Sequence, residues 1–533
     1  MANFTCNEEN EDQLETVIQK VQVFSQDIGM EFGIEKCAKC TLKNGRKTNG
    51  RNIEVSEGKF IEDLESDSTY KYLGIEENET INHRQIREKV KQEYVKRLKK
   101  ICRTELTPKN KITAINQLAI PVLTYGFGII EWPQRDLNSL DVKTRKIMTM
   151  YKLIYRHQCM DRVYLPRREG GLGLIGVEDA YRGAILNLGQ YLNETKDVHL
   201  LKVKKQHNED LPANKSILKQ AELFMREVKT AERNGDVASE DDRANATQQP
   251  GQEGNHKKHR DRFIKAERGR KRSRWKNNNR AGNFQEEINK TYIDKEGSFQ
   301  WLKNGEIGFD GERILVAAQD QGLMTNGLKK VCGLSSDDKC RFCHSEVESV
   351  NHLVSGCKEL LSDGLYTKRH NRVCKYLHWK ICKEKDIQVK EIWNHEPQPV
   401  TSNGDTTVFY DHIIRPGRYI ENKAIKPDIV IWDKTNRTAK IIDVCVPNDF
   451  GLNRAEREKV TKYQHLKNDL RETWNLKEAE VIPVVVGATG IMKTSLKKYL
   501  DMIPGKPTTR EVQSAAIRGT ISLLKTVLGS TVK

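Results

Sequence analysis

The chain is predicted to be a multidomain protein with a mostly helical N-terminal part, a polar and basic middle, a short cysteine- and histidine-containing segment and a C-terminal α/β domain. Three observations indicate this. Helical periodicity dominates the first 230 residues or so, a stretch almost without large apolar residues follows, and two apolar strands joined by a polar turn come near the C-terminal end. The length of 533 residues allows several domains, and 37% hydrophobic residues suffice for ordinary cores outside the middle.

The N-terminal part is predicted to be mostly helical. Residues Asn10–Ile28 have helical periodicity, and Tyr70–Ile75 has the pattern of a short strand. A basic amphipathic helix is expected over Ile81–Leu106, because apolar residues recur on one face. These residues are Ile86, Val90, Tyr94 and Leu98.

The middle of the chain is predicted to be a disordered, basic linker over residues 231–291. Ala231–Asn255 has almost no large apolar residues and many Asp, Gly, Asn and Gln. His256–Arg280 then holds a dozen lysines and arginines with aromatic residues among them, which suits phosphate contacts and base stacking. A solvated linker or a nuclear targeting signal is the alternative. The candidate nucleic-acid-binding residues are Lys271, Arg272, Arg274 and Trp275.

The charge of the whole chain favours a polyanionic partner. It has 91 basic and 74 acidic residues, a formal net charge of +17 and a pI of about 9.2. No apolar run follows Met1, and no stretch approaches the twenty or so apolar residues that a membrane helix needs. The protein is therefore expected to be soluble and intracellular, with no membrane partner.

Three cysteines and a histidine have the spacing of a zinc site. Two residues separate Cys340 from Cys343, eight separate Cys343 from His352, and four separate His352 from Cys357. Three thiolates and one imidazole close a tetrahedral shell without an open position, which indicates a structural Zn²⁺. Reduced core cysteines beside an incidental histidine are the alternative. The pair in Cys37–Cys40 has no second pair nearby and is interpreted as structural.

Two apolar strands in the C-terminal part each contain one aspartate. The segments Lys426–Trp432 and Ile441–Pro447 are joined by the polar turn Asp433–Arg437. A hairpin of this kind can bring Asp428 and Asp443 side by side at the sheet edge. Hard oxygen ligands that leave open positions suit Mg²⁺, as phosphodiester hydrolysis requires. Taken singly, each aspartate would rather be a turn residue or a solvated strand end.

A helix with cationic side chains follows the two aspartates. Arg454–Arg471 is predicted to be helical, and Lys459, Lys462 and Tyr463 fall on one face at spacings of three and four. A lysine there could orient the attacking water or neutralise charge on the phosphate. A functional role is favoured because Asp443 lies inside an otherwise apolar strand, where an unpaired charge would be costly.

The run from Tyr410 to Ile503 resembles the restriction-like endonuclease of site-specific non-LTR retrotransposons. This family belongs to the PD-(D/E)xK nuclease class, but its lysine has moved from the strand to the following helix. The residues that match its catalytic positions are Asp428, Asp443, Lys459, Lys462 and Tyr463. The resemblance implies that the two aspartates hold Mg²⁺ or Mn²⁺.

Two further elements bear on the resemblance. Arg369-His370-Asn371 resembles the family's basic-His-Asn element on the helix before the sheet, so Arg369, His370 and Asn371 are candidate nucleic-acid contacts. The zinc segment is placed like the knuckle that this family has between its polymerase thumb and its endonuclease. Lys426 departs from the arginine that usually precedes Pro-Asp; it keeps the charge but loses any bidentate phosphate contact.

The N-terminal part resembles the same retroelements over roughly Glu11–Leu192. Gly29–Cys37 resembles the palm segment after the Tyr-Ala-Asp-Asp of reverse transcriptases, Tyr70–Gly74 the primer-grip hairpin, and Arg167–Leu174 the glycine loop after the thumb. The chain starts where the Tyr-Ala-Asp-Asp strand should just have ended, so no two-metal polymerase site is expected. Lys36 is accordingly interpreted as a palm surface lysine.

The predicted organisation has five parts. They are a reverse transcriptase palm remnant (1–78), a thumb and helical connection (79–230), the basic linker (231–291), a helical segment with the zinc knuckle (292–360) and a restriction-like endonuclease (361–533). The resemblance implies nicking of a DNA target to prime reverse transcription in the nucleus after cytoplasmic synthesis, with the element RNA and the full-length element protein as further partners. The alternative is a catalytically inactive nucleic-acid-binding remnant.

Overall fold

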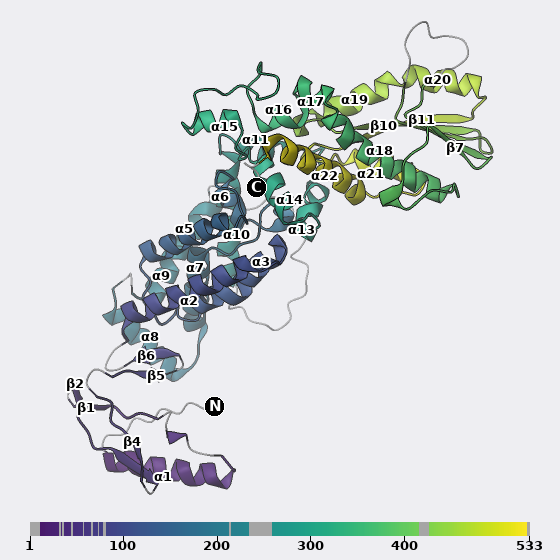
Figure 1. The fold of residues 1–533 in the computed structure, drawn as a ribbon. Helices are drawn as coiled ribbons and strands as arrows, with labels where there is room; N and C mark the ends of the chain where they lie inside the picture. The colour runs from purple at the N-terminus through teal and green to yellow at the C-terminus, as the bar shows by residue number, and fades with distance from the viewer. Residues whose placement is uncertain are drawn as a thin grey trace. The chain divides into compact units, whose positions relative to one another are not determined.

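The computed structural model divides the chain into two compact units (Figure 1). The described residues are 11–30, 33–34, 37–43, 46–56, 58–65, 68–72, 74–77, 81–212, 215–233, 258–414 and 426–529. One unit comprises Met1–Lys96 with Val122–Leu137, and the other comprises Arg97–Pro121 with Asn138–Lys533. This division differs from the five predicted parts, because the first boundary falls inside a helix and all residues from 138 onward belong to one unit.

Before α2 (His83–Arg103), the described residues of the first unit form a helix and three short hairpins. Its strands pair antiparallel as β1 (Thr41–Lys43) with β2 (Arg46–Thr48), β3 (Ile53–Ser56) with β4 (Lys59–Ile61), and β5 (Tyr70–Tyr72) with β6 (Ile75–Glu77). The single strand expected at Tyr70–Ile75 is thus a hairpin, in which Gly74 adopts the φ of +86° that glycine tolerates best. Two expected helices are confirmed as α1 (Glu11–Asp27) and α2 (His83–Arg103), although α2 continues past the unit boundary. Three of the four apolar residues that define the face of α2 are buried.

Helices dominate the chain between residues 108 and 233. They are α3 (Pro108–Ala114), a π-helical turn (Ile115–Ala119), α4 (Ile120–Thr124), α5 (Gln134–Met150), α6 (Met160–Tyr164), α7 (Val177–Glu194), α8 (Val198–Asp210) and α9 (Ile217–Arg233). After α6 comes the glycine loop, where Gly170 and Gly173 have φ of +87° and +81°. Arg162 lies fully buried beneath this loop, where it donates to the carbonyl of Gly170 and forms a 2.9 Å ion pair with Asp320. This contact joins segments 158 residues apart.

The prediction of a basic linker is wrong for the residues that the structure describes after the central gap. Residues 234–257 lie outside the described part, but Lys258–Lys276 forms α10, which packs against α6, α7 and α9. Phe263 and Trp275 are buried in the core. Trp275 stacks on Phe284 with ring centroids 6.3 Å apart, and the guanidinium of Arg162 lies 4.7 Å from its ring centroid. Burial of these aromatic side chains thus holds α10 as a packed helix, although its high charge had suggested a solvated chain.

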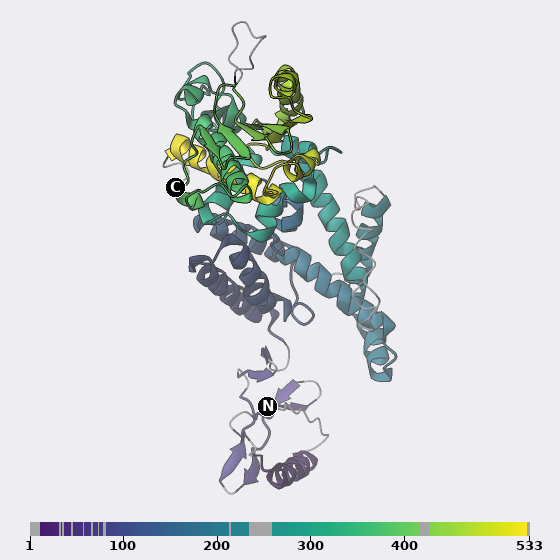
Figure 2. The same ribbon diagram turned by 90° about the vertical axis from the view of Figure 1, so that its right-hand side faces the viewer.

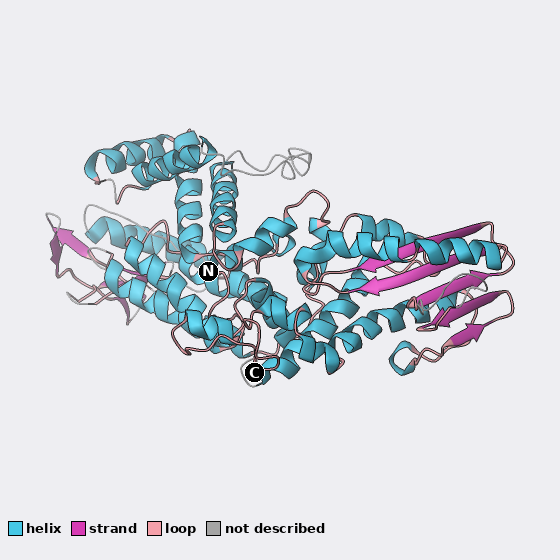
Figure 3. Ribbon diagram, turned by 90° about the horizontal axis from the view of Figure 1, so that it is seen from above, coloured by secondary structure: helices cyan, strands magenta, loops and turns pink. Residues whose placement is uncertain are grey.

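A five-stranded sheet forms the centre of the C-terminal α/β part. Helices precede it as α11 (Gly282–Ile288), α12 (Lys295–Ser298), α13 (Gln300–Asn304), α14 (Phe309–Gln319), α15 (Asn326–Val331), α16 (Val350–Ser355), α17 (Lys358–Ser362) and α18 (Leu365–Glu384). The strands in spatial order are β11 (Glu478–Val485), β10 (Thr438–Cys445), β9 (Ile429–Asp433), β8 (Thr406–Tyr410) and β7 (Val400–Ser402). Neighbouring strands are antiparallel except β10 and β11, and β9 with β10 forms the predicted hairpin (Figure 3).

Helices cover the sheet on both sides. The crossover from β10 to β11 consists of α19 (Leu452–Lys462) and α20 (Gln464–Thr473), so the single helix expected over Arg454–Arg471 is broken at Tyr463. Tyr463 and Leu466 pack with Val430 and Ile441 of the sheet. On the other side lies α18, packed along the last helix α22 (Thr509–Leu528), which follows α21 (Ser495–Asp501) (Figures 1 and 2). Across the described ranges, no helix combines the length and the apolar character needed to cross a bilayer.

Candidate functional site

The two predicted carboxylates stand opposite one another at the end of the β9–β10 hairpin. The register pairs Ile442 with Ile429, so the next step along it sets Asp443 opposite Asp428. In addition, the backbone N–H of Val444 donates to Oδ2 of Asp428 at 2.6 Å. The structure therefore brings the two carboxylates to one end of one hairpin.

Asp443 is the more buried carboxylate, with 2% of its surface exposed. Nζ of Lys459 lies 2.6 Å from its Oδ2, and the hydroxyl of Tyr463 donates to its Oδ1 at 2.5 Å. The same hydroxyl lies 3.2 Å from the carbonyl oxygen of Lys426. Lys462 is exposed and donates to the hydroxyl of Tyr463 at 2.9 Å. Lys459 and Tyr463 thus reach Asp443 directly, whereas Lys462 reaches it only through the tyrosine.

Asp428 faces α18. Nε2 of His370 donates to Oδ2 of Asp428 at 3.0 Å, and Nδ1 of His370 lies 3.0 Å from the side-chain oxygen of the exposed Asn371. One helical turn further, Cys374 is 2% exposed, and its Sγ lies 3.7 Å from the ring nitrogens of His370. His370 was predicted as a nucleic-acid contact, and in the structure its direct partner is a carboxylate of the candidate site.

Two basic residues beside the site have structural partners. The prediction of Arg369 as a nucleic-acid contact is wrong, because this side chain is 3% exposed and donates to the carbonyl oxygens of Val354 (2.7 Å) and Val446 (3.0 Å). Burial lowers the pKa of Arg369 to about 10. Lys426 forms a 2.8 Å ion pair with Asp411 on the surface. Arg369 therefore joins the helices and the sheet from inside.

Burial and neighbouring charges set the protonation states at the site. Burial alone would lower the pKa of Lys459, but the charge of Asp443 raises it overall, so Lys459 stays an ammonium ion. Burial and the same carboxylate raise the pKa of Tyr463 far above its usual value, so its hydroxyl remains a donor. Burial also opposes protonation of His370, but the hydrogen bond with Asp428 raises its pKa overall. A lysine ammonium thus faces Asp443, and a histidine whose protonation is favoured by its partner faces Asp428.

The residues present fit a divalent metal ion with oxygen ligands. Among the described residues, the buried Oδ2 of Asp443 accepts no hydrogen bond of good geometry, and the ammonium of Lys459 is its charged neighbour. Asp428 supplies a second carboxylate at the same end of the hairpin. Carboxylate oxygens are the ligands that Mg²⁺ and Mn²⁺ prefer.

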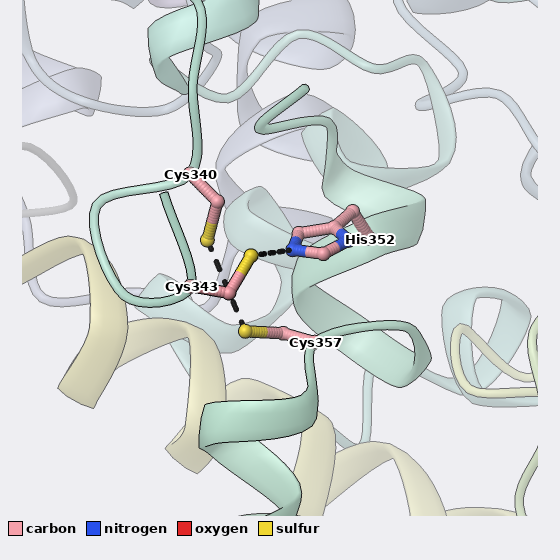
Figure 4. A group of neighbouring side chains, drawn as sticks. All are labelled: Cys340, Cys343, His352 and Cys357. Atoms are coloured by element: carbon pink, nitrogen blue, oxygen red, sulfur yellow. Dashed lines mark hydrogen bonds between the residues drawn. The ribbon is translucent and has the colours of Figure 1, made fainter. Parts of the chain in front are cut away.

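The four predicted zinc ligands also converge, in a segment before α18 (Figure 4). Sγ of Cys340 lies 3.9 Å from Sγ of Cys357, and Sγ of Cys343 lies 3.4 Å from Nε2 of His352. All four ligand atoms lie within 4.8 Å of one another. His352 belongs to α16 and Cys357 precedes α17, so only one of the last two ligands is on a helix proper. Three thiol groups and one imidazole in this arrangement fit Zn²⁺.

The candidate nucleic-acid-binding residues of α10 have partners within the protein. Three of these residues form ion pairs with acidic residues of α6, the glycine loop and α7, and they are Lys271, Arg272 and Arg274. These partners are Asp179, Glu169 and Asp161, respectively. Lys271 is 7% exposed and Trp275 is fully buried, so the predictions of a phosphate contact and of a stacking platform are wrong for these two residues. The cations of α10 hold the helix against its acidic neighbours.

Cys374 and a second polar pair on the same helix were not predicted from the sequence. His370, Cys374, His378 and Cys382 recur at every fourth position of α18, which places them along one face. His378 and Cys382 are fully buried, and Nδ1 of His378 lies 2.9 Å from Nε2 of the buried His395. The repeated His-x-x-x-Cys spacing was the signal that could have identified this face.

Comparison with known proteins gives little information on function. No family model matches the chain. The chain is similar to an uncharacterized protein of Caenorhabditis elegans, T26G10.4, with 29% identity over 147 residues. The matched region is 27% of this chain and 40% of that protein, so the chain spans well under two thirds of this relative.

Proposed function

We propose that the C-terminal α/β part of the second unit is a Mg²⁺-dependent DNA endonuclease like that of site-specific non-LTR retrotransposons. The observation that supports this most is the convergence of Asp428, Asp443 and Lys459 at the end of one hairpin. In this proposal the protein nicks target DNA in the nucleus so that the element RNA can be reverse transcribed. The full-length element protein would supply the polymerase.

In this mechanism the chain's own residues hold and orient the reacting groups. Asp428 and Asp443 would bind the metal ion, which supplies a Lewis acid and lowers the pKa of a bound water. The hydroxyl of Tyr463 fixes one oxygen of Asp443, and the backbone N–H of Val444 fixes one oxygen of Asp428. Lys459 presents its ammonium where it can stabilise charge on the phosphate.

The reaction is a hydrolysis of one DNA strand. A water oxygen bonds to phosphorus, and the bond from phosphorus to the 3′ oxygen breaks. The attacking water loses a proton, and the leaving oxygen gains one, so the products are a 3′-hydroxyl and a 5′-phosphate. The 3′-hydroxyl is the group that a reverse transcriptase can extend.

A plasmid-nicking assay tests the proposal. The wild-type protein should convert supercoiled DNA to the open circle with Mg²⁺ or Mn²⁺, and Asp443→Asn should slow this by roughly 100-fold or more, as removal of one charge-stabilising group does in enzymes. Asp433→Asn is the matched control, because Asp433 lies at the other end of β9 and also pairs with a lysine, Lys385, at 3.0 Å. Equal nicking by wild type and Asp443→Asn would assign the activity to another site or protein.

A nucleic-acid-binding protein without catalysis is the second candidate. One observation favours it: each carboxylate already has a basic partner in the protein, Lys459 for Asp443 and His370 for Asp428. A centre balanced in this way needs no metal ion for its stability. The nicking assay and a DNA-binding measurement across a salt series together separate the candidates. Salt-dependent binding without any nicking supports the second one.

We also propose that the segment before α18 binds a structural Zn²⁺ through Cys340, Cys343, His352 and Cys357. The helices that bear or flank the last two ligands, α16 and α17, have only six and five residues. Helices this short are marginal by themselves, so a metal ion would contribute directly to folding.

A further inference from the structure

Helix α18 contains two histidine–cysteine pairs with the same spacing but different surroundings. In both pairs the cysteine follows the histidine by one turn, and its sulfur lies within 3.7 Å of the imidazole. The third group differs. His370 faces the carboxylate of Asp428, whereas His378 faces the imidazole of His395.

The first pair and the carboxylate bring three metal-binding atoms together. A nitrogen of His370, the sulfur of Cys374 and an oxygen of Asp428 all lie within 4.8 Å of one another. They come from two elements, α18 and the entry to β9. The side chains of His370 and Asp428 are 28% and 16% exposed, whereas Cys374 is buried, so solvent reaches the group through His370 and Asp428.

The mixture of ligand atoms indicates which ion the group prefers. Magnesium binds oxygen almost exclusively, whereas imidazole and thiolate suit zinc. Three protein ligands, two of which are partly exposed to solvent, match the zinc sites that keep a position for water or another ligand. The second pair, with Cys382, has two imidazoles but no carboxylate, and its side chains are fully buried or nearly so.

We propose that His370, Cys374 and Asp428 form a second zinc site, distinct from the cysteine-rich site before α18. Binding joins zinc to the sulfur and releases the thiol proton to solvent. This inference does not require nuclease activity. It adds a form of control to the proposed nuclease, because Zn²⁺ and Mg²⁺ would compete for Asp428.

Metal content tests this inference. The full chain is saturated with Zn²⁺, dialysed, and analysed for zinc per protein molecule. Wild type should hold one ion more than Cys374→Ala or His370→Ala. Cys382→Ala is the matched control, since it removes a buried sulfur from the equivalent position of the second pair, and it should keep the wild-type zinc content.

Loading with Co²⁺ gives an independent readout. A sulfur bound to Co²⁺ absorbs by charge transfer, so the difference spectrum between wild type and Cys374→Ala should contain such a band, and that between wild type and Cys382→Ala should not. Equal zinc in wild type and Cys374→Ala, or loss of the ion in Cys382→Ala instead, would overturn the inference. Thermal unfolding checks that each variant is folded, and His370→Ala, which leaves the buried sulfur in place, answers the question if Cys374→Ala does not fold. A protein with the extra ion that never nicks DNA disproves only the nuclease, and a protein that nicks DNA without the extra ion disproves only this site.

Discussion

Substitution of Tyr463 by phenylalanine isolates the part that one hydroxyl has in the candidate site. Tyr463 is fully buried, and its hydroxyl donates to Oδ1 of Asp443 at 2.5 Å. Phenylalanine fills nearly the same space but leaves a buried carboxylate oxygen without its donor. The loss of a hydrogen bond to a charged group lowers the free energy of unfolding by about 1.5–3 kcal/mol. The orientation of Asp443 should also be less fixed, and loss of such a supporting contact typically lowers metal affinity or activity about 10–100-fold.

Two measurements on Tyr463→Phe test this reasoning, and Tyr181→Phe is the control. Tyr181 is 6% exposed, and its hydroxyl donates to Oε1 of Gln220 at 2.8 Å, in the helical array rather than at the sheet. Chemical denaturation should show a loss for both variants, about 1 kcal/mol for the control. Plasmid nicking should decrease only in Tyr463→Phe. If Tyr463→Phe lost stability but nicked DNA at the wild-type rate, the hydroxyl would serve packing alone and the positioning argument would be refuted.

Three further predictions concern the metal, the core and pH. Cys343→Ser should lose the zinc of its site and melt at a lower temperature. The control Cys332→Ser, at an exposed cysteine, should change neither the metal content nor the melting temperature. Trp275→Ala should lower the free energy of unfolding by about 3–5 kcal/mol, because Trp275 belongs to the core. DNA binding of the folded variant should not weaken. Unchanged stability with weaker binding would support a stacking role instead. Burial lowers the pKa of His378 to about 4 from 6.5, so the unfolded chain takes up the proton first as pH falls, and about 3 kcal/mol of stability should be lost between pH 6.5 and 4. Denaturation across this range should show a smaller loss for His378→Gln, whereas the same change at the exposed His465 should leave the loss as in wild type.

The hairpin could be predicted because its determinants are local. The polar turn between two apolar segments fixes the register, and the register sets Asp443 opposite Asp428. The break between α19 and α20 could not be predicted, since it falls at a tyrosine rather than at a helix-breaking proline or glycine. At the end of α19, the hydroxyl of Tyr463 instead contacts Asp443 of β10, which lies 20 residues earlier in the sequence. Periodicity within a segment contains no information on such a contact.

The basic helix α10 shows why composition alone misled. Its charges suggested a solvated chain, but the acidic partners of Lys271, Arg272 and Arg274 lie about a hundred positions earlier in the sequence. Burial of Phe263 and Trp275 then makes the folded helix favourable. Pairing between remote segments is a property of the tertiary structure. A net charge of +17 therefore does not identify which cations are available to a nucleic acid.

The neighbours Arg369 and His370 show the same limit at the level of single residues. Adjacent positions on a helix differ by about 100° in direction, so the two side chains meet different surroundings. Arg369 donates to buried carbonyl groups, whereas His370 reaches Asp428. The spacing along α18 predicts that His370 and Cys374 lie together, and it predicts the same for His378 and Cys382. The two pairs differ only in their third partner, which comes from elsewhere in the chain: Asp428 for His370 and His395 for His378. The carboxylate of Asp428 is therefore what makes the first group a candidate metal site.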